Sequence, residues 1–235
     1  MANEKLPSSG SKPAARIEAF LDQAQRVPAP HERPARGRLV FALDATMSRQ
    51  ATWDLAQSLQ ARMFETTATL GGLDVQLVYF RGFAECRASR FVADGAGLSE
   101  LMSKIEVRGG HTQIAKVLKH IRDETKRAKI GAFVYVGDAM EENPDDLAVT
   151  AGELGLLGVK GFLFHEGFDS AAGATFREIA RLTGGAYAAF DASAPGRLSS
   201  LLAAAAAYAA GGRSALEKQA LAGGEAARLL IAQMR

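Results

Sequence analysis

Apolar and polar positions follow two alternating patterns from Arg38 onward. Short apolar runs, of the length of a strand, alternate with longer segments in which apolar residues recur at helical spacing. This order is typical of a parallel sheet that helices cover on both faces. The runs 73–80 and 85–92 are too close together for a crossover helix, so they predict a hairpin and an antiparallel edge strand. The predicted strands are 38–44, 73–80, 85–92, 130–138, 159–165 and 186–191.

The segments between the strands predict helices, and one of them carries a complete set of start signals. Asn143-Pro144-Asp145-Asp146 offers a capping side chain, a proline at the first helical position and two acids at the positive end of the helix dipole. The expected fold is α/β: a doubly wound, mostly parallel central sheet with one antiparallel edge strand and helices on both faces. The other predicted helices are 48–67, 98–107, 113–128, 172–183 and 197–210.

These elements predict one domain with a tail at each end. Residues 1–36 are expected to form an N-terminal tail, in which a short amphipathic helix at 13–27 precedes a proline-rich linker. The domain itself spans residues 37–210. Residues 211–235 form a glycine-interrupted C-terminal tail, for which the sequence leaves open whether a short helix packs on the domain.

Composition narrows the class of protein and the kind of partner. Of the 235 residues, 48% are hydrophobic and 23% are charged, as in an ordinary globular domain. With 28 Lys and Arg against 26 Asp and Glu, the net charge of +2 predicts neither nucleic-acid nor anionic-membrane binding. Cys86 is the single cysteine, so no intrachain disulfide can form, which suits a reducing compartment. The N-terminus lacks the apolar core of a signal peptide, and no segment is apolar for long enough to span a membrane, so we expect a cytoplasmic protein without membrane insertion.

Side chains with oxygen donors follow several of the predicted strands. The first strand ends in Asp44, with Thr46 and Ser48 on the turn after it, Thr112 ends a glycine-containing loop, and Asp138 ends the central strand. Because the carboxyl ends of parallel strands meet at one edge of a sheet, we expect these side chains to converge there. Carboxylate and hydroxyl oxygens suit Mg²⁺ or Mn²⁺, and two carboxylates alone would leave the cation an open coordination position.

Three segments that carry these residues resemble a known family. FALDATMSRQ, GGHTQIAKVL and FVYVGDAMEEN follow the order found in the von Willebrand factor A (VWA) domain with its metal-ion-dependent adhesion site (MIDAS). The motif of that site is Asp-x-Ser-x-Ser, then a Thr in a glycine-preceded loop, then an Asp that closes the fourth strand. IARLTGGAYAAFDASAPGRLSSLL resembles the closing elements of such domains, so the resemblance covers residues 37–210.

The resemblance implies a role for each of the five side chains. Thr46 and Ser48 would be direct hydroxyl ligands, Thr112 would bind directly or through water, and Asp44 and Asp138 would act mainly through water. Two positions depart from the family pattern. Thr46 replaces the usual first serine but keeps the hydroxyl, and the residue after Asp138 is alanine where glycine is common.

The expected function is that of a protein-interaction adaptor and not of an enzyme. A Mg²⁺ or Mn²⁺ in the MIDAS-type site would take an Asp or Glu of a partner protein as its last ligand. Intracellular bacterial relatives of the family resemble adaptors for AAA-type ATPases or stress-response assemblies, and the resemblance implies such a partner here. One alternative is a metal-independent scaffold with a vestigial site. Another is a Mg²⁺-dependent hydrolase or phosphatase with Asp44 as nucleophile, although Thr46 stands where such a phosphatase needs a second Asp as general acid.

Other polar side chains near this edge have ordinary explanations. His111 and His165 could contact a partner, but exposed loop histidines are the expected interpretation. Glu141 and Glu142 either tune the cation site or belong to a solvated helix start. Cys86 is expected to be inert in an edge strand, unless neighbouring arginines lower the pKa of its thiol.

Overall fold

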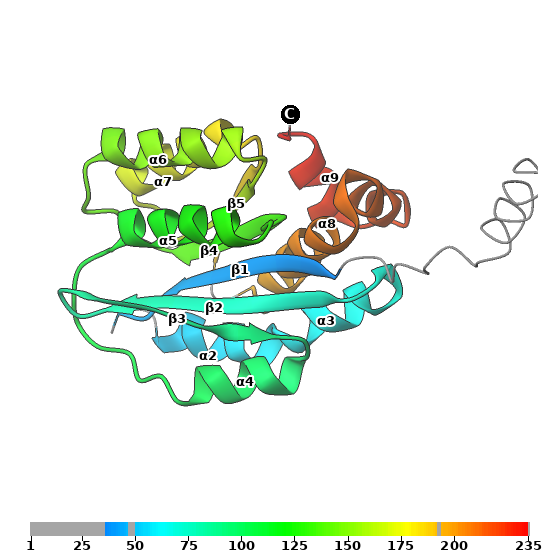
Figure 1. The fold of residues 1–235 in the computed structure, drawn as a ribbon, viewed down its shortest axis with the longest axis horizontal. Helices are drawn as coiled ribbons and strands as arrows, with labels where there is room; N and C mark the ends of the chain where they lie inside the picture. Colours follow the sequence, from blue (N-terminus) through cyan, green and yellow to red (C-terminus); the bar gives the residue numbers. More distant parts are fainter. Residues whose placement is uncertain (1–35, 47–49, 192–193, 235) are drawn as a thin grey trace, which may run out of the picture. The chain divides into compact units, whose positions relative to one another are not determined.

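A six-stranded sheet in the order β3-β2-β1-β4-β5-β6 lies at the centre of the computed structural model (Figure 1). The structure describes residues 36–46, 50–191 and 194–234, so the helix predicted at 13–27 lies outside the described residues. Neighbouring strands are parallel except β2 and β3, which form the predicted antiparallel hairpin at one edge. The strands are β1 (Gly37–Asp44), β2 (Leu73–Arg81), β3 (Glu85–Val92), β4 (Ala132–Gly137), β5 (Lys160–Glu166) and β6 (Ala186–Phe190).

Helices cover both faces of the sheet, which confirms the predicted doubly wound α/β fold (Figure 1). Alternation along β1 shows how the two layers arise, because successive strand side chains point to opposite faces. Leu39, Phe41 and Leu43 lie in one hydrophobic core, and Val40 and Ala42 lie in the other. A separate finding is that no helix among the described residues has the length and hydrophobicity of a membrane-spanning segment. The first core contains residues of α2 (Gln50–Leu59), α3 (Ala61–Thr67), α4 (Gly95–Ser103), α8 (Pro195–Leu221) and α9 (Glu225–Ile231), and the second those of α5 (Ile114–Arg127), α6 (Pro144–Leu156) and α7 (Ser170–Leu182).

Capping side chains explain where two of the helices begin. The Asn143 side chain accepts a hydrogen bond from the Asp145 N–H at 2.9 Å, so α6 begins at the proline where the sequence predicted it. Helix α4 begins at Gly95, earlier than the predicted 98–107, because the Asp94 carboxylate accepts from the Gly97 N–H at 2.8 Å. The apolar periodicity of the segment 98–107 hid this cap, since the residues of the first turn carry little hydrophobic signal.

The helix predicted at 197–210 is followed, after a kink, by a second helical segment. Helix α8 runs to Leu221, and Gly212 interrupts it with φ 66° and ψ −162°. Leu216 and Leu230 are buried in the same core as β1, which answers the question that the sequence left open for this segment. The Gln233 amide also binds the edge strand β6, because it accepts from Tyr187 N at 3.1 Å and donates to Tyr187 O at 2.9 Å. This segment therefore packs on the sheet and covers part of its open edge.

Candidate functional site

The strand order reverses at β1, because the chain adds β2 on one side of it and β4 on the other. Asp44 is the last residue of β1, and Asp138 directly follows β4. The two strands are parallel neighbours, with Leu43 opposite Val136, so the two carboxylates follow adjacent strand ends. Ligands of open α/β sheets bind at such a switch point, outside the carboxyl ends of the strands. The topology thus brings Asp44 and Asp138 to the position where a site is expected.

The turn after β1 is organised by Asp44 itself. The carboxylate of Asp44 accepts a hydrogen bond from the Thr46 backbone N–H at 2.7 Å. Such a bond from an aspartate to the backbone two residues on fixes the turn locally. Asp44 and Thr46 are 3% and 8% exposed, so both side chains sit within the protein rather than on its surface. Ser48, the third residue of the predicted motif, lies outside the described residues.

The loop that carries Thr112 lies against the ends of β1 and β2. The Arg108 N–H donates to the Ala45 carbonyl at 3.0 Å, and the His111 N–H donates to the Gly82 carbonyl at 3.2 Å. Thr112 is 7% exposed. Backbone contacts of this kind hold the loop at a set distance from the turn after Asp44.

A second set of contacts joins the Thr112 loop to the segment after Asp138. The Thr112 N–H donates to the Glu141 carboxylate at 3.0 Å, and the Glu141 N–H donates to the Thr112 hydroxyl oxygen at 3.0 Å. His111 Nδ1 lies 2.9 Å from the same carboxylate. The three chain segments that carry Asp44, Thr112 and Asp138 are therefore tied to one another, directly or through one neighbour.

The Glu142 side chain caps helix α5, which precedes it in the chain. Its carboxylate accepts hydrogen bonds from the N–H groups of Ile114 and Ala115, the latter at 3.0 Å, at the start of α5. Gln113, at the cap position of α5, makes no side-chain cap of its own. Carboxylates are favoured at this end because the first N–H groups of a helix lack partners and its dipole is positive there. The sequence singled out Glu141 and Glu142 as tuning the cation site or belonging to a solvated helix start, but not as the positioning residues that these contacts make them; the start of α5 without its own capping residue was a signal for this role.

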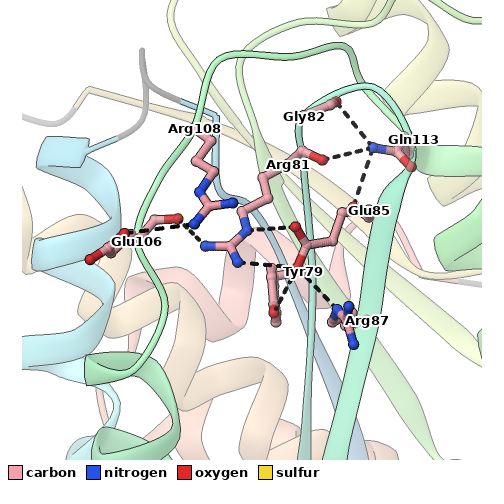
Figure 2. Close-up of polar contacts among 8 residues, drawn as sticks. All are labelled: Tyr79, Arg81, Gly82, Glu85, Arg87, Glu106, Arg108 and Gln113. Carbon is pink, nitrogen blue, oxygen red and sulfur yellow. Dashed lines mark hydrogen bonds and ion pairs between the residues drawn. The ribbon is translucent and has the colours of Figure 1, made fainter.

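Figure 2 shows how the β2–β3 hairpin supports the same loop. Arg81 binds the Glu85 carboxylate with two nitrogens, at 2.9 and 3.1 Å, and its third nitrogen donates to the Glu106 carbonyl. The bond from Arg81 holds the pKa of Glu85 below its usual value. Gln113 donates to the carbonyls of Arg81, Gly82 and Glu85, each at 3.3 Å. This network links the hairpin to both ends of the loop that carries Thr112.

The two histidines at this edge differ in exposure. His111 has a 61% exposed side chain, as predicted, and its ring lies 5.2 Å from that of Phe83. The expectation of an exposed loop histidine is wrong for His165, because β5 continues through it and the side chain is 2% exposed. His165 Nδ1 lies 2.9 Å from the Tyr187 hydroxyl and Nε2 lies 3.3 Å from the Asp138 carbonyl oxygen. Burial lowers the pKa of His165, so the neutral ring is favoured.

Cys86 is packed among apolar residues and has no activated thiolate. Burial raises the pKa of its thiol to about 11. Arg87, considered from the sequence as an activating neighbour, instead binds Glu85 at 3.0 Å, because adjacent strand residues point to opposite faces. We expect Cys86 in the native protein to react with iodoacetamide at pH 7.5 at least about tenfold more slowly than in the urea-unfolded chain. Equal alkylation rates in the two states would contradict this environment.

The donor set consists of oxygen atoms. Two carboxylates and the hydroxyls of Thr46 and Thr112 are hard donors, which fit Mg²⁺ or Mn²⁺ better than a thiolate-binding metal. Among the residues that the structure describes, no group of three or more His, Cys, Asp or Glu side chains is placed to hold a metal ion. Any cation at this edge would therefore depend on hydroxyl groups and retained water in addition to carboxylates.

Comparison with known proteins establishes the class of fold. No protein-family model and no curated protein matches the chain. Among solved structures, the VWA domain of SpRpn10 superposes with a TM-score of 0.56 at 11% sequence identity, over 70% of this chain and 95% of that domain. The chain thus has the fold of a VWA domain.

Two further structures share this fold over part of their length. Proximal thread matrix protein 1 from the mussel byssus, with a zinc-occupied MIDAS motif, gives a TM-score of 0.57 at 15% identity, over 72% of this chain and 45% of that chain. The human COPII-coat protein Sec24c gives 0.53 at 14% identity, over 76% of this chain and 33% of that chain. This chain therefore spans less than half of either structure, and at these identities the likeness establishes the fold alone.

Proposed function

We propose that this chain is a protein-interaction module whose binding depends on a divalent cation. In this proposal Mg²⁺ or Mn²⁺ is held by the five oxygen-bearing side chains at the carboxyl edge of the sheet. An Asp or Glu of a partner protein supplies the last ligand. The residues that would hold the cation are Asp44, Thr46, Ser48, Thr112 and Asp138.

The proposal depends on one observation: hydrogen bonds hold the chain segments around this edge in place relative to one another. Arg108 binds the turn after Asp44, and Thr112 and Glu141 exchange two hydrogen bonds next to Asp138. A site held in place before binding loses less conformational entropy when a ligand arrives. The VWA fold and the metal-occupied MIDAS of a mussel protein with the same fold support this assignment.

Two exposed aromatic residues would extend the contact with the partner. Phe83, in the turn after β2, is 79% exposed, and Phe168, in the loop after β5, is 96% exposed. Strand β2 runs parallel to β1 and β5 runs parallel to β4, so the loops after them emerge from the edge that holds Asp44 and Asp138. Aromatic side chains are enriched at the centres of protein interfaces. An AAA-type ATPase or a stress-response assembly remains the partner class that the family resemblance implies.

We propose binding rather than catalysis as the role of this edge. A phosphatase that used Asp44 as nucleophile would need a general acid at position 46, and the hydroxyl of Thr46 is too weak an acid for that role. A metal-independent scaffold is the remaining alternative, and it differs from the proposal in its response to cations.

Thermal unfolding tests the cation dependence. At about 100 times its dissociation constant, a cation should stabilise the wild type by about 2.7 kcal/mol, which raises Tm by about 5–10 °C over the value in chelator. Asp44→Ala should remove this rise, because it deletes a carboxylate of the site. Asp123→Ala is the matched control, since Asp123 lies on α5, outside the proposed site, with a 44% exposed side chain that pairs with Arg122.

The outcomes separate the module from the scaffold. Each titration is repeated with millimolar acetate, which supplies the carboxylate that a partner would provide. A rise in the wild type and in Asp123→Ala but not in Asp44→Ala supports the proposal. No rise with Mg²⁺ or Mn²⁺, with or without acetate, would favour the scaffold.

A further inference from the structure

A cavity of about 700 Å³ lies between α3, the start of α8 and the turn from α8 to α9. It is lined by none of the residues proposed to hold the cation. Its volume is within the range of small-molecule sites in proteins, roughly 300–1,000 Å³. The walls come from segments far apart in the sequence, which pack together only in the folded chain.

Two arginines line this cavity without a carboxylate partner. Arg62 on α3 has its Nη1 3.3 Å from the Ser199 hydroxyl, and Arg197 on α8 donates from Nε to the Ala189 carbonyl at 3.0 Å. Within the described part of the chain, neither guanidinium makes an ion pair. Both side chains are solvent-accessible, so an incoming anion can reach them. Guanidinium groups bind phosphate with two parallel hydrogen bonds more readily than other cations do.

Gln219 contributes an unpaired hydrogen-bond acceptor to the wall of the same cavity. Its side-chain oxygen Oε1 is buried and has no hydrogen-bond partner among the described residues. A buried acceptor without a partner is unfavourable, because it has lost its hydrogen bond to water and gained none in the protein. A ligand with a hydroxyl or amino group would satisfy this oxygen, whereas a bare anion would not.

We propose that this cavity binds a small, soluble phosphate monoester that also carries hydroxyl groups. Arg62 and Arg197 bind the phosphate, and Gln219 accepts a hydrogen bond from a hydroxyl of the ligand. Glu225 also lines the cavity, so its lining carries a net charge of +1, two arginines against one glutamate. This balance favours an anion with polar groups over a strongly charged polyanion. The inference is independent of the cation site.

Calorimetric titration with three probes in the presence of chelator tests the proposal. Glycerol 3-phosphate combines the anion with hydroxyl groups, inorganic phosphate presents the anion alone, and glycerol presents the hydroxyl groups alone. We expect saturable binding of glycerol 3-phosphate, weaker binding of phosphate, and no binding of glycerol. Absence of saturable binding of glycerol 3-phosphate at millimolar concentration, or equal binding of glycerol, would overturn the proposal.

Variants assign the binding to these side chains. Arg62→Gln combined with Arg197→Gln should weaken glycerol 3-phosphate binding at least about tenfold, because two charge-assisted hydrogen bonds are lost. Arg213→Gln is the control, since Arg213 lies on α8 outside the cavity and pairs with Glu217. Unchanged affinity in the double variant, or equal weakening in the control, overturns the proposal.

Gln219→Leu tests the role of the unpartnered oxygen separately. It should weaken the binding of glycerol 3-phosphate without changing that of inorganic phosphate. The Tm of the unliganded variant should not fall, because the substitution removes an acceptor that had no partner. Equal loss of both ligands would contradict the role given to Gln219.

Discussion

Gly110→Ala should abolish the cation response that we propose and lower the stability of the protein by about 1–3 kcal/mol. An alanine Cβ at this position would lie 2.1 Å from the Gly82 carbonyl oxygen and 2.4 Å from the carbon of that carbonyl. The obstacle is backbone, so no side-chain rotation can relieve it. The loop must move away from the β2–β3 turn, and Thr112 must move with it. Thermal unfolding in chelator and in excess Mg²⁺ measures both effects.

Gly109→Ala is the matched control for this substitution. The neighbouring glycine has no atom within 4 Å of the position that a Cβ would take. This variant should keep the wild-type Tm and the wild-type rise with Mg²⁺. A Gly110→Ala protein with an unchanged Tm would show that the loop yields freely, and one with a full Mg²⁺ response would show that Thr112 is not a ligand.

Gly185→Ala should destabilise the fold by about 3 kcal/mol and lower Tm by about 6–12 °C. A Cβ on Gly185, just before β6, would lie 1.9 Å from the Gly161 carbonyl oxygen and 2.7 Å from its nitrogen. Gly161 is itself confined, since a Cβ there would lie 2.6 Å from the Phe133 ring. The start of β6 would therefore have to separate from β5. Urea unfolding at constant m-value reports the loss as a lower midpoint.

Gly152→Ala is the control for Gly185→Ala, because it makes the same substitution at an unobstructed position. Gly152 lies within α6, and no atom would contact its Cβ within 4 Å. Alanine in such a helix position should stabilise by about 0.5–1 kcal/mol, because glycine loses more backbone entropy on folding. The two glycine substitutions should thus have opposite signs. A Gly185→Ala midpoint at or above that of the wild type would refute the close approach of β5 and β6.

Most of the fold could be predicted from the apolar pattern. The runs at 38–44 and 73–80 correspond to β1 and β2, and the short gap before 85–92 predicted the antiparallel hairpin correctly. Boundaries were less predictable where capping decided them, as at Asp94. The break after 210 was predicted from Gly211 and Gly212, and the backbone leaves helical geometry at Gly212 before a second helical segment runs to Leu221. What the sequence left open was whether this second segment packs on the domain, and the burial of Leu216 in the core shows that it does.

The candidate site also has features that could be predicted from the sequence and features that could not. The edge positions of Asp44 and Asp138 were predictable, because Asp44 ends one apolar strand and Asp138 follows another, and the carboxyl ends of these parallel strands must share an edge. The roles of Glu141 and Glu142 were not, since their partners at 112–115 are distant in sequence. The burial of His165 was also hidden, although the predicted strand 159–165 includes it, because the Phe176 and Tyr187 rings beside it come from later elements.

The type and order of the elements, and the oxygen-bearing residue types at the carboxyl edge, could be predicted without the folded structure. Both are local properties, since periodicity and residue type are set within a few positions. The folded structure was needed to show which loops are tied together around Thr112, and which helices bring Arg62, Arg197 and Gln219 to one cavity. Those features depend on contacts between residues far apart in the chain, which form when the sheet and its helices pack and which no single segment encodes.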